Sequence, residues 1–195
     1  MKVMLLDNNT ERSTTIKEGL VKAGYPNVLC IAMDRDTDLL KLVRQHVPDM
    51  IIIDMESPDQ DTLESLHSVD REMPRPIVFF ADRSDSKTTQ AAINAGVNAY
   101  IVDGFSDKRL KTILDVAIAR FKTFHELRSE LEDYKQRLGD RKDVDKAKGI
   151  LMEYRQLSEE SAYQLLRKMA MSRNMKIGEA ARNFIASMTL LDGKS

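Results

Sequence analysis

The fold of this chain is decided by a short apolar stretch near its first quarter, Ile51-Ile52-Ile53-Asp54-Met55. Three consecutive isoleucines favour a β-strand, and the run is too short for a helix. A strand that is apolar along its whole length is buried on both faces, as in parallel sheets. The stretch therefore predicts a central parallel strand that ends in a carboxylate.

Five such runs of strand length alternate with segments of helical spacing along the first 120 residues. The runs lie at residues 3–6, 28–32, 50–53, 77–80 and 99–102. Repeated strand–helix units predict a parallel sheet with helices on both faces. We therefore expect residues 1–120 to form a five-stranded, doubly wound α/β domain.

A long helical pattern follows, with apolar residues at steps of three or four over residues 108–138 and one phase break near Phe124 and Leu127. About 30 helical residues span roughly 45 Å, which is more than a small domain covers. We therefore expect residues 107–140 to form a linking coiled-coil helix in a homodimer. The alternative is an ordinary amphipathic helix packed on its own domain.

Residues 136–190 show three shorter helical patterns, which predict a small three-helix module. Gly139 loosens or interrupts the long helix in this reading, and Gly149 indicates close approach of a neighbouring helix. Ser158 is a good N-cap for the second helix, and Asn174 can end that helix in a left-handed turn.

Composition and charge narrow the classes of protein. Charged residues make up 31% of the chain, there is one cysteine (Cys30), and three histidines are scattered. No apolar run approaches the roughly 20 residues of a membrane span. A single cysteine cannot form an intrachain disulfide, and it suits the reducing cytoplasm. We therefore expect a cytoplasmic protein without disulfides or cofactors. Residues 1–120 carry 15 basic and 19 acidic side chains, whereas residues 141–183 carry 10 and 6. The basic C-terminal part is the candidate for contact with a polyanion.

The predicted carboxyl edge of the sheet collects Asp7-Asn8, Asp54, Ala81-Asp82 and Asp103-Gly104. This layout resembles the receiver domains of two-component response regulators. The resemblance implies that Asp54 matches the phosphoryl acceptor and that the acidic pair beside it holds Mg²⁺, a cation that prefers oxygen ligands.

The departures from the receiver pattern concern the chemistry of the site. Asn8 replaces one carboxylate, Ala81 stands where a hydroxyl residue is expected, and Asp103 stands where a lysine is expected. Groups that stabilise charge in phosphoryl transfer are therefore missing. We interpret the domain as a pseudo-receiver with an acidic pocket of Asp7, Asn8 and Asp103 around Asp54, and with at most a weak Mg²⁺ site at Asp7 and Asp54. A signal would then arrive by protein contact, at residues 103–105 or in the loop 56–59.

The C-terminal module resembles the ANTAR family of RNA-binding antitermination modules. The resemblance rests on Ala147-Lys148-Gly149-Ile150-Leu151-Met152, followed by Ala162-Tyr163, Leu166-Arg167 and Ala170-Met171. It implies binding to hairpins in leader transcripts, which basic and stacking side chains read. The candidates for RNA contact are Lys146, Lys148, Tyr163, Arg167, Lys168, Arg173 and Lys176. Tyr163 can equally belong to the core, and any single Lys or Arg can be a solvated bystander.

Motifs along most of the chain resemble NasT-type regulators of nitrate and nitrite assimilation, for example Met55-Glu56-Ser57-Pro58 and Pro74-Arg75-Pro76. That resemblance implies a nitrate-sensing partner protein that holds the pseudo-receiver inactive. We expect a non-enzymatic antiterminator. Two alternatives remain: a phosphorylation-activated, DNA-binding response regulator and a phosphotransfer enzyme centred on Asp54. The first needs a basic recognition helix, and residues 177–188 offer only Arg182.

Overall fold

The computed structural model describes residues 1–34, 37–102, 105 and 107–192. The chain divides into two compact units, Met1–His125 and Glu126–Ser195. The first unit contains the strands β1 (Lys2–Asp7), β2 (Asn27–Ala32), β3 (Met50–Met55), β4 (Ile77–Ala81) and β5 (Ala99–Val102). All pairings are parallel and the strand order is β2-β1-β3-β4-β5. The predicted five-stranded parallel sheet is confirmed.

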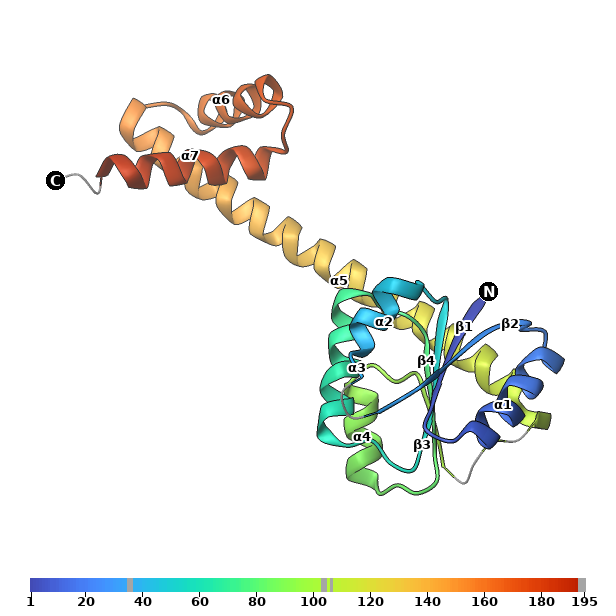
Figure 1. Ribbon diagram of the computed structural model, residues 1–195. Coiled ribbons are helices and arrows are strands. Elements are labelled where there is room, and N and C mark those ends of the chain that lie inside the picture. The colour runs from blue at the N-terminus through green and yellow to red at the C-terminus, as the bar shows by residue number, and fades with distance from the viewer. Residues whose placement is uncertain (35–36, 103–104, 106, 193–195) are drawn as a thin grey trace. The chain divides into compact units, whose positions relative to one another are not determined.

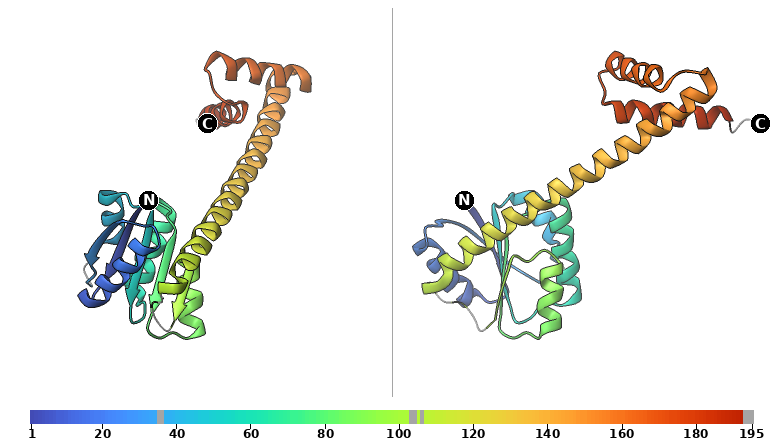
Figure 2. Two further views of the ribbon diagram at one scale, coloured as in Figure 1. Left: turned by 90° about the vertical axis from the view of Figure 1, so that its right-hand side faces the viewer. Right: turned by 180° about the vertical axis from the view of Figure 1, so that it is seen from behind.

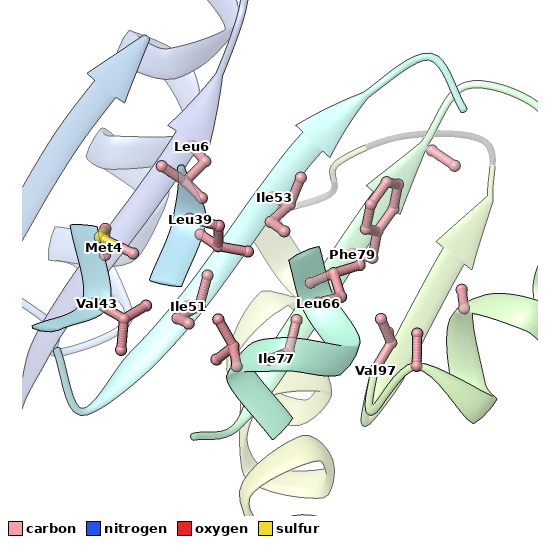
Figure 3. Packing of buried hydrophobic residues seen from close by; sticks show 14 residues of the cluster. Met4, Leu6, Leu39, Val43, Ile51, Ile53, Leu66, Ile77, Phe79 and Val97 are labelled. Atoms are coloured by element: carbon pink, nitrogen blue, oxygen red, sulfur yellow. The ribbon is translucent and has the colours of Figure 1, made fainter. Parts of the chain in front are cut away.

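Helices cover both faces of this sheet (Figure 1). One face packs against α2 (Leu39–His46), α3 (Gln60–Glu72) and α4 (Ser86–Asn94). The other face packs against α1 (Thr10–Lys22) and the start of α5 (Asp107–Arg155). Figure 3 shows the first of these cores, in which Leu39, Val43 and Leu66 lie over Ile51 and Ile53. The runs in β1, β3 and β4 are therefore central strands because both of their faces are covered, whereas β2 and β5 form the edges of the sheet.

The C-terminal unit is built from the end of α5 together with α6 (Glu159–Ser172) and α7 (Ile177–Asp192), as Figure 2 shows. Its small core contains Ala147 and Leu151 from α5, Ala162 and Leu166 from α6, and Ala181 from α7. Ser158 accepts a hydrogen bond from Ser161 N–H as the N-cap of α6. Asn174 has a φ of 52°, so the predicted left-handed turn after α6 is confirmed.

Two expectations about this unit are corrected. The helix α5 continues without interruption through Gly139, so the first helix of the module is the C-terminal part of α5 and not a separate element. A Cβ at Gly149 would meet nothing within 4 Å, so Gly149 does not mark a close helix approach. That approach is at Gly178 in α7, where a Cβ would lie 2.4 Å from Cγ of Asp140 and 2.6 Å from its Cβ.

Replacing each of these two glycines by alanine should change the stability of the chain in opposite directions. Gly178→Ala should destabilise the module by about 1–3 kcal/mol, because Asp140 must move and its ion pair with Arg182 must break. Gly149→Ala should stabilise the chain by up to about 1 kcal/mol, because alanine favours a helix and has room there. Urea unfolding of both variants measures the difference. Equal stabilities would contradict the assigned helix contact.

Candidate functional site

The receiver pocket lies at the carboxyl ends of β1, β3 and β4. Asp7 and Asp54 are register partners on neighbouring strands, and both are buried, with 3% and 1% of their surface exposed. Asp7 Oδ1 accepts a hydrogen bond from Asn9 N–H at 2.7 Å, and Asp7 Oδ2 accepts one from the Ser13 hydroxyl at 3.0 Å. The structure therefore brings together two of the predicted acidic residues. Asn8 is exposed, and Asp103 lies outside the described residues.

Arg12 completes this pocket, although no sequence motif pointed to it. Its Nη2 lies 2.6 Å from Asp54 Oδ1 and its Nη1 lies 2.8 Å from Asp82 Oδ2. Arg12 is placed by the first turn of α1, which Asn9 caps by accepting hydrogen bonds from Glu11 N–H and Arg12 N–H. Its position in the sequence could have revealed it. The helix that follows β1 begins at the carboxyl edge of the sheet, so a basic residue in its first turn lies near the pocket.

The charges of this pocket shift its acid–base equilibria. Burial raises the pKa of Asp54 to about 6, although the positive charge of Arg12 opposes that shift. The second oxygen of Asp54, Oδ2, is buried without a hydrogen-bond partner in the described structure. By contrast, the hydrogen bond from Arg12 lowers the pKa of Asp82, which lies at the rim. The fold therefore balances the negative charge of ionised Asp54 only in part.

A pH dependence of stability follows from this burial. Asp54 binds its proton more tightly in the folded chain than in the unfolded one, where its pKa is 3.8. The cost of the ionised form is therefore absent below about pH 4 and fully present above pH 6, on the order of 3 kcal/mol. Asp54→Asn should remove it, so that the variant exceeds the wild type in unfolding free energy at pH 7 and loses this advantage towards pH 4. A difference that does not change with pH would contradict the assignment.

The candidate RNA-contacting side chains lie in the second unit. Tyr163, Arg167 and Lys168 are exposed on α6, and the two cations border a hollow of about 510 Å³ with Gln164, Met171 and Ser172. We call these six residues the α6 outer face. Tyr163 is 39% exposed and lies outside the buried cluster, so it is not a core residue. Lys146, Arg173 and Lys176 are exposed elsewhere on the unit.

Lys148 differs from the other candidates because it is held inside the module. Its Nζ lies 2.9 Å from Asp145 Oδ1 and 2.7 Å from Glu159 Oε1, and its side chain is 16% exposed. The hydrogen bonds from Lys148 to Glu159 and Asp145 raise its pKa above the ordinary value. Lys148 therefore joins α5 to the first turn of α6.

An apolar stripe runs along the middle of α5. Phe124, Leu127, Leu131, Tyr134 and Leu138 are all exposed, at steps of three and four residues. Charged residues surround the stripe, and among the described residues no helix is long and apolar enough to cross a membrane. The spacing is that of a coiled-coil seam.

Comparisons with known proteins agree with both units. Residues 3–115 match the response regulator receiver domain, and residues 132–185 match the ANTAR domain. The transcriptional regulatory protein PdtaR of Mycobacterium tuberculosis is 28% identical over 74% of this chain and 70% of its own length. The nitrate regulatory protein of Klebsiella oxytoca is 36% identical over 80 residues, which are 41% of this chain and 20% of that protein.

Solved structures support the fold of the first unit. The receiver domain of a NarL response regulator from Mycobacterium tuberculosis has a TM-score of 0.51 at 20% identity, covering 60% of this chain and 94% of that one. A response regulator from Thermotoga maritima has a TM-score of 0.51 at 17% identity, covering 60% and 97%. The pocket geometry, the parallel sheet and the two family matches together show that the chain belongs to the response regulators, with a receiver domain followed by an ANTAR domain.

Proposed function

We propose that this protein is an RNA-binding transcription antiterminator that recognises hairpins in leader transcripts through the α6 outer face. The observation that carries the proposal is the composition of that face within an ANTAR domain. An exposed tyrosine lies one helical turn before Arg167 on α6, and Arg167 and Lys168 border a shallow hollow. Aromatic rings stack on unpaired bases and cations bind the phosphates, which is how proteins read RNA loops.

The alternative of duplex DNA binding is disfavoured by α7. A recognition helix needs several polar or basic side chains that reach base edges. The sequence of α7 contains one basic residue, Arg182, and its Nη1 lies 2.5 Å from Asp140 Oδ1 and 3.2 Å from Asp143 Oδ2. This arginine is engaged with α5, so it serves the module and not a groove.

We further propose that the chain works as a homodimer through the α5 stripe. Five exposed apolar side chains at heptad spacing match a second copy of the same helix, because each seam residue then meets its equivalent. A dimer presents two ANTAR units, which suits a pair of hairpins bound together. The two contacts then reinforce one another through their effective concentration.

Control by a partner protein completes the proposal. Within the receiver unit, Ala81 offers no hydroxyl to a phosphoryl group, and Arg12 already pairs with Asp54. A non-catalytic receiver that is operated by protein contact accords with this pocket, and we propose the cytoplasm as its location. We propose the genes of nitrate and nitrite assimilation as the target and a nitrate-sensing protein as the partner. The 80-residue similarity to the nitrate regulatory protein of Klebsiella oxytoca supports the link to nitrate.

The proposal is tested by selection from RNA in which two hairpins with randomised loops are joined by a short linker. The full chain should enrich particular loop sequences and bind the enriched RNA at least about 100-fold more tightly than a DNA duplex of the same sequence. Addition of the candidate sensor protein should weaken the binding. Equal affinity for RNA and duplex DNA, with no enriched loop, would refute the proposal.

A further inference from the structure

The receiver pocket contains a positive charge that the chain itself supplies. One guanidinium group bridges Asp54 at the end of β3 and Asp82 after β4, through contacts of 2.6 and 2.8 Å. Such short, charge-assisted hydrogen bonds to two carboxylates hold a planar guanidinium in a fixed orientation. Arg12 therefore lies where the carboxylates at this edge of the sheet converge.

The residues present do not fit the divalent cation that the receiver family implies. Mg²⁺ needs near-octahedral oxygen ligands. Here Asp54 Oδ1 is bonded to Arg12, and both oxygens of Asp7 already accept hydrogen bonds from Asn9 and Ser13. Within residues 1–34, 37–102, 105 and 107–192, no group of three or more acidic, histidine or cysteine residues could hold a metal ion. The guanidinium charge would also repel a divalent cation.

We propose that Arg12 is the resident cation of this pocket and takes the place of the divalent ion. Asp54 is then a structural carboxylate paired with Arg12, and the state of the receiver unit does not depend on Mg²⁺ or on a phosphodonor. This inference concerns the receiver pocket alone. It does not rest on RNA binding by the ANTAR unit, so the two can fail separately.

Burial makes Asp54 dependent on Arg12. Asp54 is 1% exposed, and Oδ2 has no hydrogen-bond partner in the described structure, so Arg12 provides its charge compensation. An uncompensated buried charge destabilises a fold strongly. Arg12 also borders an open hollow of about 440 Å³ with Asp82 and Phe105, so a small cation from solvent can reach the position of its guanidinium.

Arg83 offers a matched control in the same loop region. Its Nη2 lies 2.7 Å from Glu56 Oε1, but both side chains are largely exposed, at 77% and 64%. Exposed ion pairs contribute little to stability, so Arg83→Ala removes the same charge from the same edge of the sheet without uncovering a buried carboxylate.

The experiment measures the Tm of the full chain and of its Arg12→Ala and Arg83→Ala variants. The salts are millimolar MgCl₂, methylguanidinium chloride and tetramethylammonium chloride at matched ionic strength. We expect no specific effect of Mg²⁺ on the wild type and little change in Arg83→Ala. Arg12→Ala should have a Tm lower by several degrees, and methylguanidinium, but not tetramethylammonium, should restore part of the loss.

Three results would overturn the inference. They are a rise in the Tm of the wild type that is specific to Mg²⁺, an Arg12→Ala variant as stable as the wild type, and a destabilised variant that methylguanidinium does not rescue. Where Arg12→Ala does not fold, Arg12→Gln takes its place. Incubation of the wild type with Mg²⁺ and acetyl phosphate, followed by mass spectrometry, is a second test. An unchanged mass supports the inference, and a stoichiometric gain of a phosphoryl group overturns it.

Discussion

Leu131→Glu is expected to abolish self-association of the chain. Leu131 lies at the centre of the α5 stripe. Leu127 lies one turn before it and Tyr134 lies one turn after it. In a paired helix the substitution removes the burial of one leucine per copy and places two like charges against each other. Burial of a leucine contributes about 1.5–3 kcal/mol, so the dissociation constant should rise by at least about 100-fold. Sedimentation equilibrium measures it directly.

Ser129→Glu is the matched control for this prediction. It introduces the same side chain two residues away, at an exposed position outside the stripe, and should leave the dimer intact. Because two linked ANTAR units reinforce each other, Leu131→Glu should also weaken binding to paired hairpins more than binding to a single hairpin. A wild-type chain that is monomeric, or a Leu131→Glu chain that still dimerises, would remove the α5 stripe from the account.

The combined variant Arg167→Ala, Lys168→Ala is expected to lose about 100-fold in RNA affinity. Both side chains are exposed on the α6 outer face, so their removal should leave the Tm unchanged. Each contact to a phosphate or a base contributes about 1–3 kcal/mol, and each lost phosphate contact flattens the dependence of affinity on salt concentration. Fluorescence anisotropy over a series of salt concentrations measures both effects.

The control here removes two cations from the receiver unit. Lys17 and Lys111 are exposed on α1 and α5, so Lys17→Ala, Lys111→Ala changes the net charge equally without touching the α6 outer face. Lys148→Ala distinguishes the loss of an RNA contact from a loss of stability. It should lower the Tm of the module, because the ion pair that joins α5 to α6 is removed. If the control loses as much affinity as the combined variant, RNA binding depends on total charge and not on this face.

Much of the first unit could be predicted from local pattern. The five apolar runs are too short for helices, and those of β1, β3 and β4 are covered on both faces. Arg12 escaped such reasoning since its partners Asp54 and Asp82 are 42 and 70 residues away in the sequence. A pocket assembled from three separate strand ends is fixed by the register of the sheet, which no single motif encodes.

The errors in the second unit have a common physical cause. A glycine in a helix costs only about 1 kcal/mol, so Gly139 neither ends α5 nor interrupts it. The same modest cost lets Gly149 stand at an exposed helical position without a neighbour. Gly178 is the glycine that a helix contact requires, and its partner Asp140 lies on another helix, beyond the reach of local periodicity.

In our proposal this protein acts on the RNA transcript and not on the DNA template. The direct measurement uses elongation complexes of RNA polymerase halted downstream of the promoter, on DNA that encodes the selected paired hairpins followed by a terminator. Because initiation is complete, binding at the promoter cannot contribute. The account predicts that wild-type protein raises the fraction of full-length transcript and that Arg167→Ala, Lys168→Ala does not. An unchanged fraction from halted complexes, together with an effect on initiation, would contradict it.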